Sequence, residues 1–241
     1  MISRIATGAL ALLAMAAPAM ANLTFTDGTF DPANYTATVV FLTDPANSSF
    51  VSGQCTVCGN PPGLGQFFSM NVTTTPAGVL FGAETLINNG FSYDPSTQGP
   101  ITSITASVDK NLGVNIQSSG GNTFRPTIEQ GGVFYAAAIP GPTLNTVPGG
   151  GFTGYNTIAN TLTAADFVQY DPTTSTFGTA HPNFAGGAML FGLTQQFGSN
   201  AMETITAEYD NLSFVIATPE PAGMLVLGAG FAGLLALRRR A

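Results

Sequence analysis

The chain has 241 residues, a formal net charge of −7, and charged side chains at only 8% of its positions. Residues 22–217 carry two basic residues, Lys110 and Arg125, against twelve of the thirteen acidic residues. A body this acidic does not neutralise phosphates, which argues against nucleic acid and anionic lipid as partners.

The first 21 residues have the pattern of a cleavable secretory signal peptide. Arg4 supplies the positive start, residues 5–17 are apolar, and Ala19-Met20-Ala21 is a small-x-small cleavage site. The apolar run is too short to be a permanent membrane span. We therefore expect a signal helix over residues 1–21, export by the Sec machinery, and a mature chain that begins at Asn22.

The last segment, residues 218–241, has a second processing pattern. Pro219-Glu220-Pro221 is followed by the apolar or small residues 222–237 and then by Arg238, Arg239 and Arg240. A helix of that length spans about 24 Å, less than the hydrocarbon core of about 30 Å. The arginines hold their end in the cytoplasm by the positive-inside rule. We expect a transmembrane-like helix that stays in the inner membrane only until the chain is cut.

This terminus resembles the PEP-CTERM sorting signal, in which a Pro-Glu-Pro motif, a Gly/Ala/Leu-rich helix and an arginine cluster follow in that order. The resemblance covers residues 218–241. It implies processing by an exosortase, a membrane cysteine protease, with the Pro-Glu-Pro motif and the three arginines as the sorting motif. It also implies delivery to the cell surface or extracellular matrix of a Gram-negative bacterium, often one that makes exopolysaccharide. An ordinary short tail anchor is the alternative.

The remaining residues, 22–217, form one predicted domain. Short runs of alternating apolar and polar residues are separated by Gly, Pro and Asn, which is typical of strands. We expect strands over residues 23–26, 35–42, 67–74, 78–87, 101–108, 112–117, 124–130, 133–139, 189–193 and 204–216. A helical turn capped by Thr163 is the exception. The pattern predicts an all-β fold, an antiparallel β-sandwich of the jelly-roll type. A β-solenoid is the alternative, although no fixed-period repeat is present.

The body also resembles a recurrent exported bacterial domain of unassigned function, similar to lectin-like jelly rolls. The resemblance is carried by Phe30-Asp31-Pro32, Gly59-Asn60-Pro61, Tyr93-Asp94-Pro95, Ile101-Thr102-Ser103-Ile104, Phe191-Gly192 and Asp210-Asn211-Leu212. These are turn and packing residues, so the resemblance implies a fold and no chemistry.

The two cysteines form a Cys55-Thr56-Val57-Cys58 motif. A redox pair of this spacing lies at a helix N-terminus, but Gly59-Asn60-Pro61-Pro62-Gly63 follows here, and that stretch does not start a helix. In an oxidising compartment we expect Cys55 and Cys58 to form a structural disulfide.

Residues for catalysis are scarce. His181 is the single histidine and precedes a proline, with no nucleophile nearby in the sequence, so neither a catalytic triad nor a zinc site is expected. A pair of carboxylates could still cleave a glycosidic bond, and the candidates are Glu84, Glu129, Glu203 and Glu208. None of the four lies in a recognisable catalytic motif.

Two ligands are compatible with the residues present. Calcium is bound by Asp, Asn and backbone oxygens in loops, and Asp27 and Asp210 would converge if the terminal strands run together. No other cofactor is expected. Carbohydrate binding would rely on tyrosines, because the chain has no Trp. The candidates for sugar stacking are Tyr35, Tyr93, Tyr135, Tyr155 and Tyr170.

These observations predict an exported surface or matrix protein without enzymatic activity that binds secreted polysaccharide or coexists with it. One alternative is a secreted carbohydrate-active enzyme that uses paired carboxylates. The other is a structural matrix protein without a ligand.

Overall fold

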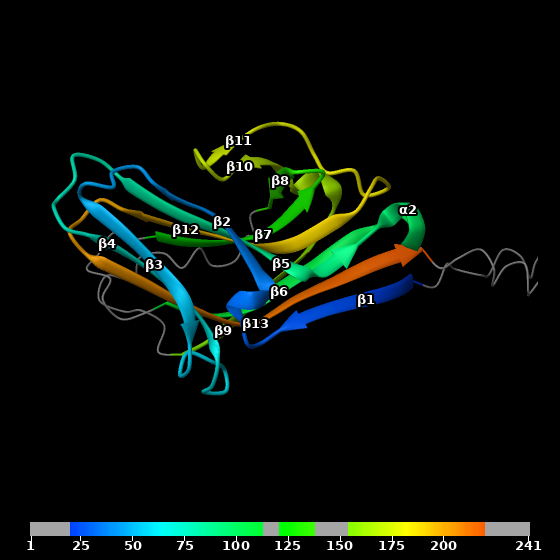
Figure 1. Ribbon diagram of the computed structural model, residues 1–241, viewed down its shortest axis with the longest axis horizontal. Coiled ribbons are helices and arrows are strands. Elements are labelled where there is room, and N and C mark those ends of the chain that lie inside the picture. Colours follow the sequence, from blue (N-terminus) through cyan, green and yellow to red (C-terminus); the bar gives the residue numbers. More distant parts are fainter. Residues whose placement is uncertain (1–19, 113–120, 138–153, 220–241) are drawn as a thin grey trace, which may run out of the picture.

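A computed structural model describes residues 20–112, 121–137 and 154–219 of the chain (Figure 1). These residues form two antiparallel sheets joined by loops, with only short helical turns, so the all-β prediction is confirmed. Within these ranges no helix is long and apolar enough to cross a membrane. The expected signal helix and the expected C-terminal helix lie outside the described residues.

Sheet A has six strands. Five of them lie in the order β3-β4-β13-β6-β9, and β1 pairs with the end of β13 that β4 leaves free. Their bounds are β1 Met20–Asp27, β3 Ser48–Cys55, β4 Gly65–Val72, β6 Ser103–Leu112, β9 Asn156–Leu162 and β13 Thr204–Pro219.

Sheet B has seven strands in the order β11-β10-β8-β7-β12-β5-β2. Their bounds are β2 Tyr35–Leu42, β5 Leu80–Tyr93, β7 Gly121–Gln130, β8 Val133–Ala136, β10 Val168–Asp171, β11 Thr176–Phe177 and β12 Met189–Ser199. Figure 1 shows β8, β10 and β11 on the side of sheet B that faces away from sheet A. The short helical turns are η1 Pro32–Asn34, α2 Pro95–Gln98 and η2 Ala164–Asp166, the last capped by Thr163 as predicted.

The core lies between the two sheets and consists mainly of Phe, Ile, Leu and Ala side chains. In β6, alternate residues Ile104, Ala106 and Val108 are fully buried in this core. Rings from both sheets meet there, for example Phe191 of β12 and Phe214 of β13, with centroids 5.5 Å apart.

A bulge in β13 keeps both halves of this long strand turned toward the core. Before the bulge the buried apolar residues are odd-numbered, as at Ile205 and Ala207, and after it they are even-numbered, as at Leu212. The register with β6 shifts between Asp210 and Ser213, and Asn211 has a positive φ of 51°. An extra residue of this kind resets the side-chain alternation of a strand.

The strands β1 and β13 bring the two ends of the described chain together. Met20 pairs with Pro219, and Asn22 pairs with Ala217, in an antiparallel ladder. Figure 1 shows the start of β1 and the end of β13 at one end of the molecule, near α2. The sheet therefore extends beyond the predicted body, 22–217, at both ends.

Candidate functional site

A groove of about 570 Å³ lies on the face of sheet B that points away from sheet A. Its walls come from opposite edges of the sheet, β2 and β5 on one side and the segment that leads into β11 on the other, while β7 and β12 form its floor. It is lined by Phe41, Thr43, Val79, Phe81, Gly82, Gly121, Thr123, Arg125, Thr174, Ser175, Phe177, Gln196, Phe197 and Gly198.

Two phenylalanines of the groove are unusually exposed for aromatic residues. Phe81 on β5 is 50% exposed and Phe177 on β11 is 43% exposed. Exposed apolar surface gathered in one place commonly marks a binding site. The tyrosines named as candidates for sugar stacking do not line the groove. Tyr93 and Tyr170, for example, are buried.

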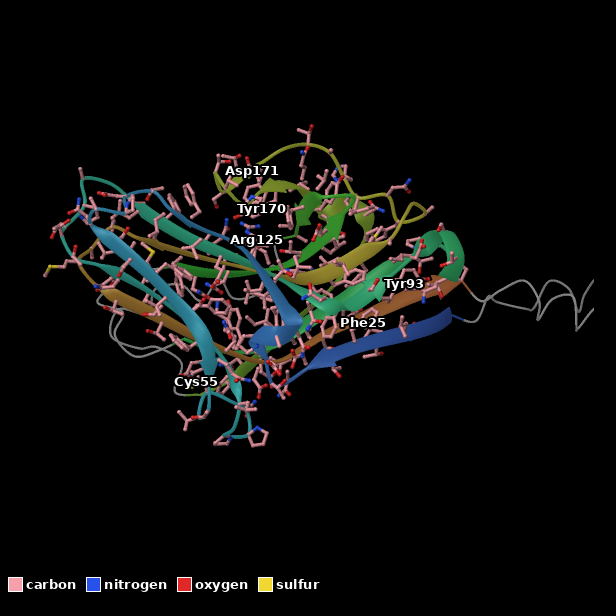
Figure 2. All side chains as sticks on the ribbon, viewed as in Figure 1. Phe25, Cys55, Tyr93, Arg125, Tyr170 and Asp171 are labelled. Carbon is pink, nitrogen blue, oxygen red and sulfur yellow. A yellow bond between two sulfur atoms is a disulfide. The ribbon has the colours of Figure 1, made fainter. Side chains whose placement is uncertain are left out.

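Arg125 is the basic residue of the groove, and two contacts fix its side chain. Its guanidinium carbon lies 4.8 Å from the centroid of the Phe177 ring. Its Nε donates a hydrogen bond of 2.6 Å to Oε1 of Gln196, whose Nε2 donates to Ser175 Oγ at 2.9 Å. Burial lowers the pKa of Arg125, but an arginine keeps its charge in proteins. Figure 2 shows Arg125 below Tyr170, on the side of sheet B that carries the β10–β11 hairpin.

The β10–β11 hairpin is held over Arg125 by its own contacts. The Tyr170 and Phe177 rings lie with centroids 5.0 Å apart, and the Tyr170 hydroxyl lies 3.1 Å from Ser175 Oγ. Because Ser175 also accepts the hydrogen bond from Gln196, one polar network joins the wall of the groove to its floor. This network positions the guanidinium before any ligand arrives.

Next to Arg125, a row of threonines crosses three strands on the same face. Thr194 lies opposite both Arg125 and Thr85 in the ladders. Its hydroxyl is 2.9 Å from that of Thr85 and 2.8 Å from that of Thr127. All three side chains are fully buried, so they support the floor of the groove and do not contact a ligand.

The groove lining that the structure describes contains no Asp or Glu. Glu84 faces the core, where it hydrogen-bonds with Ser52. Glu208 lies on β13 of sheet A, where its Oε2 accepts from Asn111 at 2.9 Å. Glu129 and Glu203 are likewise absent from the lining. The structure thus brings no pair of the candidate carboxylates into this groove.

Asp27 and Asp210 approach the same junction, at the end of β1 and the bulge of β13. A side chain at Gly28 would lie 3.3 Å from Asp210 Oδ1, which shows how closely the chain after β1 passes Asp210. The Asp27 carboxylate, however, accepts from Thr29 N at 2.7 Å and from the Tyr35 hydroxyl at 2.9 Å.

Amides surround Asp210 and its ladder partner Asp109. The backbone N–H of Asn60 donates to Asp210 Oδ2 at 2.5 Å, and Nδ2 of Asn211 donates to Asp109 Oδ2 at 2.9 Å. In the part of the chain that the structure describes, no group of three or more His, Cys, Asp and Glu is arranged to hold a metal ion. Calcium binding by Asp27 and Asp210 stays a prediction.

The predicted disulfide is present. Cys55 and Cys58 are bonded, with Cα atoms 5.5 Å apart. The bond closes the loop after β3, the same loop whose Asn60 donates to Asp210. His181 lies on a surface loop, with Nδ1 2.7 Å from the Phe167 carbonyl oxygen. These residues lie outside the groove.

The sorting motif is described only at its first residue, since Pro219 is the last residue of β13. Glu220, Pro221, Arg238, Arg239 and Arg240 lie outside the described residues, so their predicted roles stay predictions.

No family model matches the chain, and no curated protein matches it. A family 11 carbohydrate-binding module from Clostridium thermocellum, solved with a mixed-linked tetrasaccharide, is 10% identical, with a TM-score of 0.41 over 83% of this chain and 96% of that one. A module that recognises mannan is 10% identical, with a TM-score of 0.38 over 81% and 98% of the two chains. An exo-β-agarase is 15% identical, with a TM-score of 0.38 over 82% of this chain and 25% of its own. Likenesses this weak assign no function to the chain.

Proposed function

We propose that this chain is an exported protein of the cell surface or extracellular matrix, without enzymatic activity, whose jelly-roll body binds polysaccharide in the groove over sheet B. The observation that carries the proposal is the composition of the groove. Exposed phenylalanine rings stand on its walls, amide and hydroxyl groups lie between them, and no carboxylate is among its described lining residues.

The dimensions and chemistry of the groove suit a sugar chain. Its volume of about 570 Å³ lies within the range of ligand-binding clefts, roughly 300–1,000 Å³. A pyranose ring presents apolar C–H groups on its faces and hydroxyls around its edge. Phe81 and Phe177 offer apolar surface to the faces, and Gln196, Ser175 and Thr123 offer hydrogen bonds to the hydroxyls.

The alternatives differ in what the groove would have to contain. A glycoside hydrolase needs two carboxylates placed about 5–9 Å apart around the scissile bond. The described lining residues supply none, so binding without cleavage is the better-supported function. A purely structural matrix protein would not require two exposed rings beside a fixed guanidinium.

The route to the cell surface in this proposal follows from the two ends of the sequence. The Sec machinery exports the chain, the C-terminal helix holds it in the inner membrane for a time, and an exosortase cuts near Pro219-Glu220-Pro221. Pro219, the first residue of the proposed cleavage motif, is also the last residue of β13.

A glycan array and a polysaccharide pull-down with the full-length chain test the binding function. We expect retention of at least one polysaccharide, without release of shorter sugars over time. Retention of none by folded protein would refute the binding function. Turnover of the retained glycan would instead support the enzyme alternative.

Variants locate the binding site. Replacing Phe81 and Phe177 together with Ala should abolish retention, because the groove loses the exposed ring on each of its walls. Val51→Ala is the matched control, since Val51 is 56% exposed and lies on β3 of the other sheet. Equal binding by the double variant and the control would place the ligand elsewhere on the protein.

A further inference from the structure

Arg125 is the accessible cation in the described part of an acidic chain. The other basic residue there, Lys110, is 1% exposed and faces the core. Despite twelve acidic residues in the body, no ion pair of Arg125 with a described carboxylate is present, and no Asp or Glu is among the residues that line the groove around it. An arginine in this position has its charge available to a ligand.

The contacts of Arg125 leave the two terminal nitrogens of its guanidinium available to that ligand. Nε is occupied by Gln196, and Phe177 lies against the planar group. The two terminal nitrogens make no hydrogen bond to a residue that the structure describes. Together they present parallel N–H donors, the geometry that binds both oxygens of a carboxylate. Since the side chain is already fixed, little conformational entropy is lost on binding.

We propose that the groove binds a polysaccharide that carries carboxylate groups, with Arg125 as the residue that recognises a uronate. This inference rests on the proposed polysaccharide-binding function and specifies its ligand class. Charge complementarity supports it, because a positive charge stands in a groove whose lining has no negative one. The acidic remainder of the body repels a polyanion, so binding depends on correct placement of a carboxylate at Arg125 and not on general attraction.

Matched ligands separate the carboxylate from the rest of the sugar. Polygalacturonate and alginate are each compared with their carboxyl-reduced, neutral forms, and a neutral mixed-linked β-glucan is added. Binding to the full-length chain is measured by affinity electrophoresis and calorimetry. We expect at least one acidic polymer to bind about ten- to a hundredfold more tightly than its reduced form, the usual effect of one charged hydrogen-bonded contact.

Substitutions at Arg125 test the assigned residue. Arg125→Gln should remove the preference for the acidic polymer, so that the variant binds the acidic and the reduced form with similar affinity. Arg125→Lys should retain only part of it, because an ammonium keeps the charge but loses the two-pronged donor. Val51→Ala again serves as the control, and far-UV circular dichroism with thermal unfolding shows that each variant is folded.

The remaining outcomes are distinct. Equal binding of acidic and reduced polymers, unaltered in Arg125→Gln, would overturn the uronate inference and leave polysaccharide binding in place. If Arg125→Gln still binds the acidic polymer more tightly than the reduced form, Arg125 is not the residue that recognises the carboxylate. Absence of binding to every polysaccharide, including the neutral glucan, would refute the proposed function itself.

Discussion

The ammonium nitrogen of Lys110 lies 5.7 Å from the centroid of the Tyr209 ring, inside the sandwich. The same nitrogen donates to the Asn122 carbonyl oxygen at 3.1 Å, and the Tyr209 hydroxyl donates to Asn122 Oδ1 at 3.2 Å. Both Lys110 and Tyr209 are almost fully buried. Lys110 has polar neighbours here, but no carboxylate of the described residues pairs with it. Its charged form therefore lowers the free energy of unfolding.

Lys110→Met should therefore stabilise the protein, and more at pH 6 than at pH 9. Burial lowers the pKa of Lys110 to about 7 from an ordinary value of 10.5. Between these values the unfolded chain binds a proton that the folded chain does not, so the free energy of unfolding of the wild type rises with pH. The advantage of the variant should shrink by about 2–3 kcal/mol from pH 6 to pH 9. Urea unfolding at both pH values measures it, and an equal advantage at both would contradict the prediction.

Glu84→Gln should show the opposite dependence on pH. Burial raises the pKa of Glu84, partly offset by its hydrogen bond with Ser52, and its Oε2 has no hydrogen-bond partner among the described residues. The folded chain thus keeps a proton that the unfolded chain loses, and wild-type stability falls as pH rises above the ordinary value of 4.5. The variant, which cannot ionise, should be more stable than the wild type at pH 7 and lose this advantage near pH 4. Chemical unfolding at the two pH values is the measurement. An advantage that does not change with pH would show that Glu84 is charged in the fold.

Replacing both Cys55 and Cys58 with Ala should lower the free energy of unfolding by about 2 kcal/mol, because the closed loop is short. Polysaccharide retention should not change, since neither residue lines the groove. Intact mass before and after reduction should differ by two protons in the wild type. Two thiols that alkylate without reductant in freshly exported protein would contradict the disulfide.

Calcium at the junction of β1 and β13 would link stability to the ion. If Asp27 and Asp210 bind calcium, EGTA should lower Tm and excess calcium should restore it, because a ligand that binds only the folded chain stabilises it. Asp210→Asn should remove that dependence on calcium. An identical Tm in EGTA and in millimolar calcium would exclude the site.

The sorting prediction separates two steps at the C-terminus. Replacing Arg238, Arg239 and Arg240 with Asn should allow unprocessed chain to pass through the membrane and lose surface display, because charge arrests translocation. Replacing Pro219-Glu220-Pro221 with Ala should leave arrest intact but block release, so a full-length membrane-bound form accumulates. Immunoblots of membrane and surface fractions measure both. Normal cutting and display of the second variant would mean that the tail is a plain anchor.

The sequence predicted the fold better than the groove. The expected strand with strict alternation, 101–108, is present as β6, which begins at Ser103, and the β-branched run 35–42 is present as β2. The strands that were missed, β3, β9, β10 and β11, are short or rich in Ser, Gly, Asn and Thr. Their pairing with longer neighbours supplies the stability that their own composition does not, as tertiary context often does for strands.

The groove could not be predicted from the sequence, and the reason differs from the one for the missed strands. Phe81 and Phe177 have the same residue type as the core phenylalanines, and a period of two does not tell which face of a strand is covered. Gln196 is a diagonal neighbour of Arg125 on the adjacent strand β12, but Phe177 reaches Arg125 from β11, which is three strands away in the order of sheet B. The single usable signal was the scarcity of basic residues, which made Arg125 conspicuous in the sequence.

The pairing of Asn22, the expected first residue of the mature chain, with Ala217 has a consequence for engineering. Paired residues of antiparallel strands lie roughly 5 Å apart, so a few glycines and serines could join the body into a ring without disturbing sheet A. The exposed two-residue turn at Gly131 and Gly132, between β7 and β8, is a suitable place to open that ring. A circular permutant of this kind would carry the groove on an intact scaffold, and its new ends, to which a partner could be fused, would lie on sheet B instead of sheet A.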